Sequence, residues 1–199
     1  MKTYETVNTT TGEVTSVIKY LPAQPFEYRY NGSTGGFQQG ETPLFDPQNK
    51  PVRAFTIQPI AWRAFDAEMF NRKRVDKWVE LFFVDDKGRL SHILFNNSSV
   101  TLFMQLAKDL FYDGVALNEV VLSITSEKIT KDVNGQQLTW YAAKFGYTKA
   151  DPEVIEMYAD FAADFPIYAE RTITNTEVYH FKSANFLGGQ HLFESILSE

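Results

Sequence analysis

The stretch KWVELFFVDDKGRLSHILFNNSSVTLFMQLAKDLFY, residues 77–112, predicts a strand, a tight turn, a second strand and a helix. Lys77–Val84 and Arg89–Phe95 are rich in aromatic and β-branched residues, which favour strands. Between them, Asp85-Asp86-Lys87-Gly88 has the composition of a type I turn followed by a left-handed glycine, a common hairpin closure. Asn96-Asn97-Ser98-Ser99 then offers N-cap side chains for the helix.

Further strands are predicted on both sides of this hairpin and helix. Val52–Pro59 precedes them and is expected to end at its proline, while Ile60–Arg74 is expected to be irregular or helical. Leu117–Thr125 and Leu138–Tyr147 follow as a second hairpin, because the Asn134-Gly135 pair between them strongly favours a hairpin turn. The middle of the chain therefore reads strand, strand, strand, helix, strand, strand.

The two ends of the chain predict smaller elements. Thr3–Val7 and Val14–Tyr20 have the character of short strands, and a helix is expected from Asp151 to Pro166. Ile167–Thr174 and Val178–Lys182 are predicted as short strands. Three sets of apolar side chains are expected to be buried or docked: Phe26, Tyr28 and Tyr30 on one strand face, Leu102, Phe103, Leu106, Leu110 and Phe111 along the first helix, and Leu192, Phe193, Ile196 and Leu197 on the chain itself or on a neighbouring subunit.

Composition limits the class of protein. The 199 residues are 44% hydrophobic and 15% aromatic, which is typical of a packed globular chain. There is no cysteine, so disulfides and thiolate metal ligands are excluded. The sequence shows neither a secretion signal nor an apolar run of membrane-spanning length, so we expect a cytoplasmic protein without a membrane partner.

Charge is unevenly distributed along the chain. The net charge is −6, but residues 50–89 hold nine Lys and Arg against six Asp and Glu, a balance of +3. Residues 151–199 hold two against nine, a balance of −7. A basic middle beside an acidic section is compatible with a nucleic-acid surface.

No enzyme signature is present. The histidines His92, His180 and His191 are scattered without the spacing of metal ligands, and no Gly-x-Ser-x-Gly elbow occurs. The acidic residues and Lys87 near Gly88 are explained by a solvated turn. We therefore expect no catalytic residue, no metal and no cofactor.

The order of elements, the basic and aromatic content near the first three strands and the acidic C-terminal section resemble single-stranded DNA-binding proteins with an OB-fold, of phage or mobile-element type. The resemblance implies a mainly β protein with some helix: a five-stranded OB-fold-like barrel with a helix between strands three and four. The expected domains are an N-terminal β extension over residues 1–50, the barrel over 51–149 and an acidic C-terminal α/β extension over 150–199. Bacterial relatives of this class end in a disordered acidic tail with a terminal Phe, whereas this chain ends in Phe193-Glu194-Ser195-Ile196-Leu197-Ser198-Glu199.

The strand Lys77–Val84 has two unequal faces. Val79, Leu81 and Phe83 form an apolar face suited to the core, whereas Trp78 and Phe82 share the other face with a glutamate. Either these two aromatics stack on a ligand, or a helix or another subunit covers them. A glycine bulge at the turn would place Leu90, His92 and Leu94 beside them, and the turn sequence favours this register over the alternative with Arg89, Ser91, Ile93 and Phe95.

Single-stranded nucleic acid is held by basic grooves and by aromatic faces on which bases stack. The expected DNA-binding residues are Trp62, Arg63, Arg72, Lys73, Arg74, Lys77, Trp78, Phe82, Lys87, Arg89, Trp140 and Lys144. The expected function is single-stranded DNA binding with little sequence specificity, in replication or recombination, by a protein that could be a homo-oligomer. The alternative is a structural or assembly protein that associates with itself through its barrel and C-terminal extension. A barrel that binds a small ligand or an oligosaccharide would also use aromatic platforms but accounts less well for the basic cluster.

Overall fold

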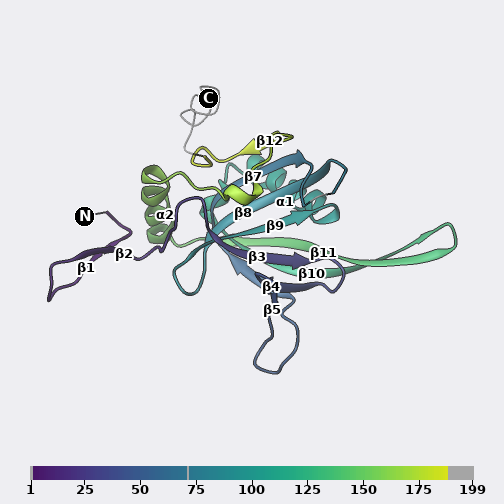
Figure 1. Ribbon diagram of the computed structural model, residues 1–199, viewed down its shortest axis with the longest axis horizontal. Helices are drawn as coiled ribbons and strands as arrows, with labels where there is room; N and C mark the ends of the chain where they lie inside the picture. The colour runs from purple at the N-terminus through teal and green to yellow at the C-terminus, as the bar shows by residue number, and fades with distance from the viewer. Residues whose placement is uncertain (1, 71, 188–199) are drawn as a thin grey trace.

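The computed structural model describes residues 2–70 and 72–187, apart from the Val133 side chain, as a mainly β chain with two α-helices (Figure 1). The strands are β1 Glu5–Val7, β2 Val14–Ser16, β3 Phe26–Asn31, β4 Gly36–Gln39, β5 Thr42–Pro43, β6 Ala54–Ile57, β7 Pro59–Ala67, β8 Asp76–Val84, β9 Leu90–Asn96, β10 Val120–Val133, β11 Gln136–Lys149 and β12 Val178–Lys182. The helices are α1 Ser98–Tyr112 and α2 Pro152–Asp164, with single 3₁₀ turns at Leu117–Glu119 and Glu170–Thr172.

The hairpin of β8 and β9 lies at the centre of a seven-stranded sheet with the order β12-β7-β8-β9-β3-β4-β5. Its turn has Gly88 at φ 71°, and the Gly88 N–H donates to the carbonyl oxygen of Asp85 at 2.9 Å. Phe82 faces His92 and Trp78 faces Asn96 across the strands. The bulged register predicted from the turn sequence is therefore confirmed.

Two predictions about flanking segments were wrong. Residues 60–67 continue as β7, which pairs with β8 through a register shift between Pro59 and Ala61. Both faces of β7 are covered, so its apolar residues do not alternate with polar ones and the segment does not read as a half-exposed strand. The segment 167–174 is not a strand but an isolated bridge from Ile167 to Phe186 followed by a 3₁₀ turn, whereas β12 is confirmed.

The second hairpin is longer than predicted. β10 and β11 pair over 14 residues each, and their turn has Asn134 and Gly135 at positive φ, as a type I′ turn requires. β6 pairs with β10, so these three strands form a separate sheet. The far half of the hairpin projects well beyond the body of the molecule (Figure 1).

Among the described residues no sheet closes into the expected five-stranded barrel. The reason is β3, which pairs in parallel with β9, with Tyr28 opposite Ile93. Beyond β3, the Gly32 carbonyl oxygen accepts a hydrogen bond of 2.8 Å from the Tyr141 N–H of β11. The strand Phe26–Asn31 thus lies between the two strands whose direct pairing would close a barrel.

The two helices cover different surfaces. α1 packs on β8, β9 and β11, and its buried side chains include Phe103, Leu106 and Leu110 of the predicted stripe, whereas Phe111 is 77% exposed. Phe111 lies in the last turn next to the buried Leu110, on the side of the helix that faces solvent. α2 begins as predicted: Asp151 accepts from the Glu153 N–H at 2.8 Å and Pro152 occupies the first turn.

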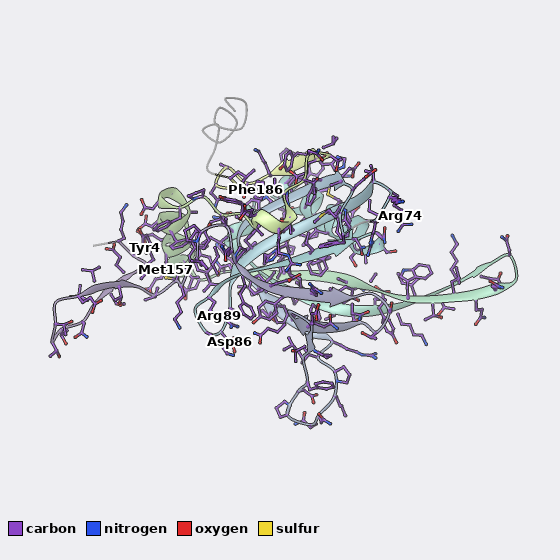
Figure 2. The ribbon with its side chains drawn as sticks, viewed as in Figure 1. Tyr4, Arg74, Asp86, Arg89, Met157 and Phe186 are labelled. Carbon is purple, nitrogen blue, oxygen red and sulfur yellow. The ribbon has the colours of Figure 1, made fainter. Side chains whose placement is uncertain are left out.

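The central sheet has a core on each face. Val79, Leu81 and Phe83 pack under α1 and β10, as predicted. On the opposite face, Phe82 packs with Phe161 of α2 and with residues from both ends of the chain. Figure 2 shows the segments of Tyr4, Met157 and Phe186 gathered on this side. Other segments of the same chain therefore cover Phe82, and the Phe186 ring lies 6.0 Å from its own.

A buried ion pair joins the strands on this second face. Arg63 of β7 and Glu80 of β8 are both 0% exposed, and Arg63 Nε donates to Glu80 Oε2 at 2.7 Å. The guanidinium also contacts Glu177 at 2.8 Å and donates to the carbonyl oxygen of Thr172 at 2.8 Å. Glu80 Oε1 lies 2.7 Å from His92 Nδ1. Every charged group here has a partner, which is what burial of charge requires.

The apolar residues Leu192, Phe193, Ile196 and Leu197, predicted to dock, lie outside the described residues. No helix within residues 2–70 and 72–187 has the length and apolar character needed to span a membrane.

The dependence of stability on pH tests the role of Glu80 in the buried network. Burial alone raises the pKa of Glu80, but the Arg63 charge and the His92 hydrogen bond outweigh it and hold that pKa below the ordinary value. A lowered pKa in the folded state stabilises the protein above the unfolded pKa of about 4.3. This contribution is lost as the pH falls through the folded pKa.

We expect Glu80→Gln to lower the free energy of unfolding at pH 7 by about 3–5 kcal/mol, because Arg63 loses its buried partner. Urea titrations from pH 7 to pH 3 should show the difference from the wild type shrinking below about pH 4.3, where Glu80 in the unfolded chain begins to take up a proton while the folded carboxylate stays ionised. Glu127→Gln, at an exposed position of β10, is the control. A difference that grows on acidification would contradict this assignment.

Candidate nucleic-acid interface

A groove of about 880 Å³ opens where five parts of the chain meet. It is bounded by β3, the loop between β7 and β8, the start of β8, the junction of β9 with α1, and β11. Its lining includes Arg29, Phe70, Arg72, Arg74, Trp78 and Trp140. The groove is thus built from both the expected barrel strands and the N-terminal β segment.

The basic side of the groove is the loop between β7 and β8. Arg72 and Arg74 are 41% and 65% exposed, and both bind the Asp76 carboxylate, at 3.2 and 3.0 Å. Asp76 is only 9% exposed, so it holds the two guanidinium groups in place while leaving most of their donors to solvent. Figure 2 shows Arg74 at the outer edge of this loop.

The aromatic residues of the groove differ in accessibility. Phe70 is 48% exposed, and its φ of 54° is rare for a bulky residue. It meets Trp78 edge-on at 5.5 Å, and the Arg72 guanidinium lies 5.3 Å from the Trp78 ring. Trp78 is therefore only 4% exposed, so the expectation that it offers a stacking face is wrong. Phe70 is the accessible face on this side.

Trp140 lies on the other side of the groove. It is half-buried, and its Nε1–H donates to Ser98 Oγ at 3.1 Å, which ties the indole to the first turn of α1. The neighbouring Ser99 Oγ accepts from the Ala143 N–H at 2.9 Å. These two bonds fix β11 against α1. Trp140 therefore keeps a defined orientation with part of its ring open to solvent.

β3 adds a third arginine. Arg29 is 39% exposed and pairs with Glu27 at 2.7 Å, and Glu27 also lines the groove. Three arginines thus face one glutamate among the charged residues that line it. With Asp76, which binds two of these arginines, three positive charges stand against two negative ones, and the small positive balance suits an anion rather than a cation.

Several residues predicted from the sequence lie elsewhere. Arg63 and Phe82 are 0% exposed inside the second core, so their predicted exposure to DNA was wrong. Trp62 lines a different hollow beside α2. Lys87 and Arg89 belong to the turn at the opposite end of the β8–β9 hairpin from Trp78, and Figure 2 shows Arg89 and Asp86 far from Arg74.

Arg89 has a structural task at that turn. Its guanidinium contacts Asp85 at 2.7 Å and lies 3.7 Å from the Phe26 ring. Lys73, Lys77 and Lys144 are exposed but do not line the groove. Of the twelve predicted residues, the groove brings together Arg72, Arg74, Trp78 and Trp140.

The sequence did not point to Phe70 or Arg29. Arg29 reaches the groove only because β3 joins β9 in parallel, a pairing across 65 residues from Tyr28 to Ile93. Phe70 was placed in a segment expected to be irregular or helical, although its position just before a basic triplet was a usable signal.

Comparisons with models of protein families, with curated proteins and with solved structures find no match to this chain. Within the described part of the chain, no three His, Asp or Glu side chains gather as metal ligands.

The Phe82→Ala variant tests whether Phe82 belongs to the buried core and not to the groove. Removing a fully buried Phe side chain typically costs about 3–5 kcal/mol of stability, since a cavity remains. We expect urea denaturation to show this loss, while Phe70→Ala, at a position 48% exposed, stays close to the wild type in stability. The affinity of the folded Phe82→Ala protein for oligonucleotides should be unchanged. A Phe82→Ala variant that keeps full stability but fails to bind DNA would instead show that Phe82 belongs to the binding interface.

Proposed function

We propose that the protein binds single-stranded DNA with little sequence preference and without a catalytic step, in replication or recombination in the cytoplasm. The groove between the β7–β8 loop and β11 is the proposed binding site. The observation that carries the proposal is that Arg72 and Arg74 line one groove together with Phe70 and Trp140. Phosphates would contact the arginines, and bases would stack on the two aromatic rings.

The choice of a single strand follows from the aromatic faces. A base can stack on a side chain only when it is not already stacked within a duplex, so exposed rings in a positive groove favour unpaired nucleotides. None of these contacts reads a base edge, which is why we propose little sequence preference.

The fold supports the same proposal. We propose that residues 51–149 form an OB-fold opened on one side by β3. The chain of β6 and β7 pairs with β10 at one end and with β8 at the other, as the first strand of an OB-fold does, and α1 follows the third strand. The OB-fold binds oligonucleotides near its first loop, which corresponds to the β7–β8 loop on this groove, whereas Trp140 belongs to the last strand and not to the turn at Asn134-Gly135.

Removal of either accessible ring should weaken binding. A stacked base contributes about 1–3 kcal/mol, so Phe70→Ala and Trp140→Ala should each raise the Kd for a dT oligonucleotide about 5- to 150-fold at low salt. Phe111→Ala is the control, because Phe111 is 77% exposed but lies outside the groove. Fluorescence anisotropy of a labelled oligonucleotide measures the Kd values. Equal losses in all three variants would contradict the groove as the site.

The arginines are tested by salt dependence. For single strands the slope of log K against log salt is about −0.7 per neutralised phosphate, so Arg72→Gln with Arg74→Gln should reduce its magnitude by about 1.4. Lys50→Gln with Lys87→Gln removes the same charge from exposed positions outside the groove and should leave the slope unchanged. Both proteins are first checked for folding by circular dichroism. An identical slope in the arginine variant would contradict the phosphate contacts.

The assembly alternative gives a different result in the same experiments. A protein that shows no oligonucleotide binding at low salt, but forms defined oligomers in light scattering, would support self-association in place of DNA binding.

A further inference from the structure

The residue that precedes α1 lines the proposed groove and has an unusual conformation. Asn97 has φ 52° and ψ −122°, outside the left-handed region that asparagine tolerates best. Its side chain caps no N–H of the helix, although asparagine is among the preferred capping residues. In contrast, Asp151 precedes α2 at φ −68°, and its carboxylate accepts from the Glu153 N–H at 2.8 Å. The start of α1 therefore lacks an ordinary cap.

Asn97 shares a positive φ with Phe70, at 54°, and both residues line the groove. Residues held in such conformations gather at ligand sites, because the strain persists only where the surrounding structure imposes it. The Asn97 side chain is also exposed. An exposed amide that does not serve the helix can serve a ligand in the groove.

In the chain, Asn97 lies between the two parts of the groove that carry aromatic rings. Its neighbour Asn96 pairs across the strands with Trp78, against which the accessible phenylalanine packs. Its other neighbour, Ser98, accepts the hydrogen bond from Trp140. The Asn97 amide is therefore attached one residue from each part.

A side-chain amide suits one part of a nucleic acid. It carries a donor next to an acceptor, and the Watson–Crick edge of every base likewise presents a donor beside an acceptor. Because the amide can rotate by half a turn, it can meet the two groups in either order. In a duplex this edge is already paired, so only an unpaired base can form the contact.

We propose that the Asn97 amide hydrogen-bonds the Watson–Crick edge of a base held in the groove, and so selects unpaired bases without selecting among them. The inference rests on the proposed DNA-binding function and adds to it a residue that determines specificity for single strands. It also accounts for the missing cap, because the amide is used for the ligand instead of the helix.

A methylated thymine tests the contact. N3-Methylthymine keeps its ring faces for stacking but lacks the N3–H donor on the Watson–Crick edge. The wild-type protein should bind an N3-methylthymidine oligonucleotide about 5- to 150-fold more weakly than dT of the same length, the discrimination that a good bidentate contact gives. Fluorescence anisotropy measures both Kd values. This comparison needs no variant, so it does not depend on how a variant folds.

The Asn97→Gly variant assigns the loss to this residue. Glycine adopts a positive φ without strain, so the variant should melt at or above the wild-type temperature. It should bind dT about 5- to 150-fold more weakly than the wild type and no longer discriminate against the methylated oligonucleotide. Asn49→Gly is the matched control, at φ 61° and exposed outside the groove, and should keep both wild-type Kd values.

Equal binding of the two oligonucleotides by the wild type would overturn this inference and leave the DNA-binding function in place. Discrimination that persists in Asn97→Gly would have the same meaning, because the methyl group would then be sensed by another residue. A wild-type protein that binds neither oligonucleotide at low salt would overturn the DNA-binding function and this inference with it.

Discussion

The ion pair between Arg63 and Glu80 is the constraint on which the covered face of the central sheet depends. Two charges at 0% exposure are tolerated only when each is fully paired, and here the partners come from β7, β8, β9 and the segment 172–177. The network therefore fixes the C-terminal part of the chain on the sheet. The Arg63 guanidinium also lies 3.9 Å from the Phe65 ring and 4.8 Å from the Phe186 ring, so a charged residue organises an aromatic core.

The proposed binding groove lies at the end of the β8–β9 hairpin that carries Trp78. There the loop between β7 and β8, the start of α1 and the long strand β11 line one groove. Asp76 orients two arginines at one wall, and Ser98 orients Trp140 at the other. Arg72, Arg74 and Trp140 are thus each held by a polar partner within the protein, which would reduce the entropy cost of the proposed binding.

Local patterns predicted local structure well. The turn sequence from Asp85 to Gly88 identified both the first hairpin and its register, and Asn134-Gly135 identified the second turn. Both signals are strong because positions with left-handed backbone in a turn are mostly occupied by Gly and Asn. Burial was harder to predict. Arg63 carries a charge that usually signals exposure, and only its position opposite Glu80 in the folded sheet reveals the pairing. Trp78 was placed on the correct side of its strand, but Phe70 and Arg72 cover it, and Arg29 enters the groove through a pairing that no local signal contains.

The position of β3 has a consequence for the order in which the chain folds during synthesis. Tyr28 faces Ile93, so the strand leaves the ribosome 65 residues before the strand that it pairs with. At about 5–20 residues per second, this delay lasts about 3–13 s. During that time β3 can pair only with β4, its neighbour in the chain, while its other edge has no partner. The N-terminal strands are therefore expected to join the sheet only once β9 has been made, and this open edge exposes the chain to misassociation until then.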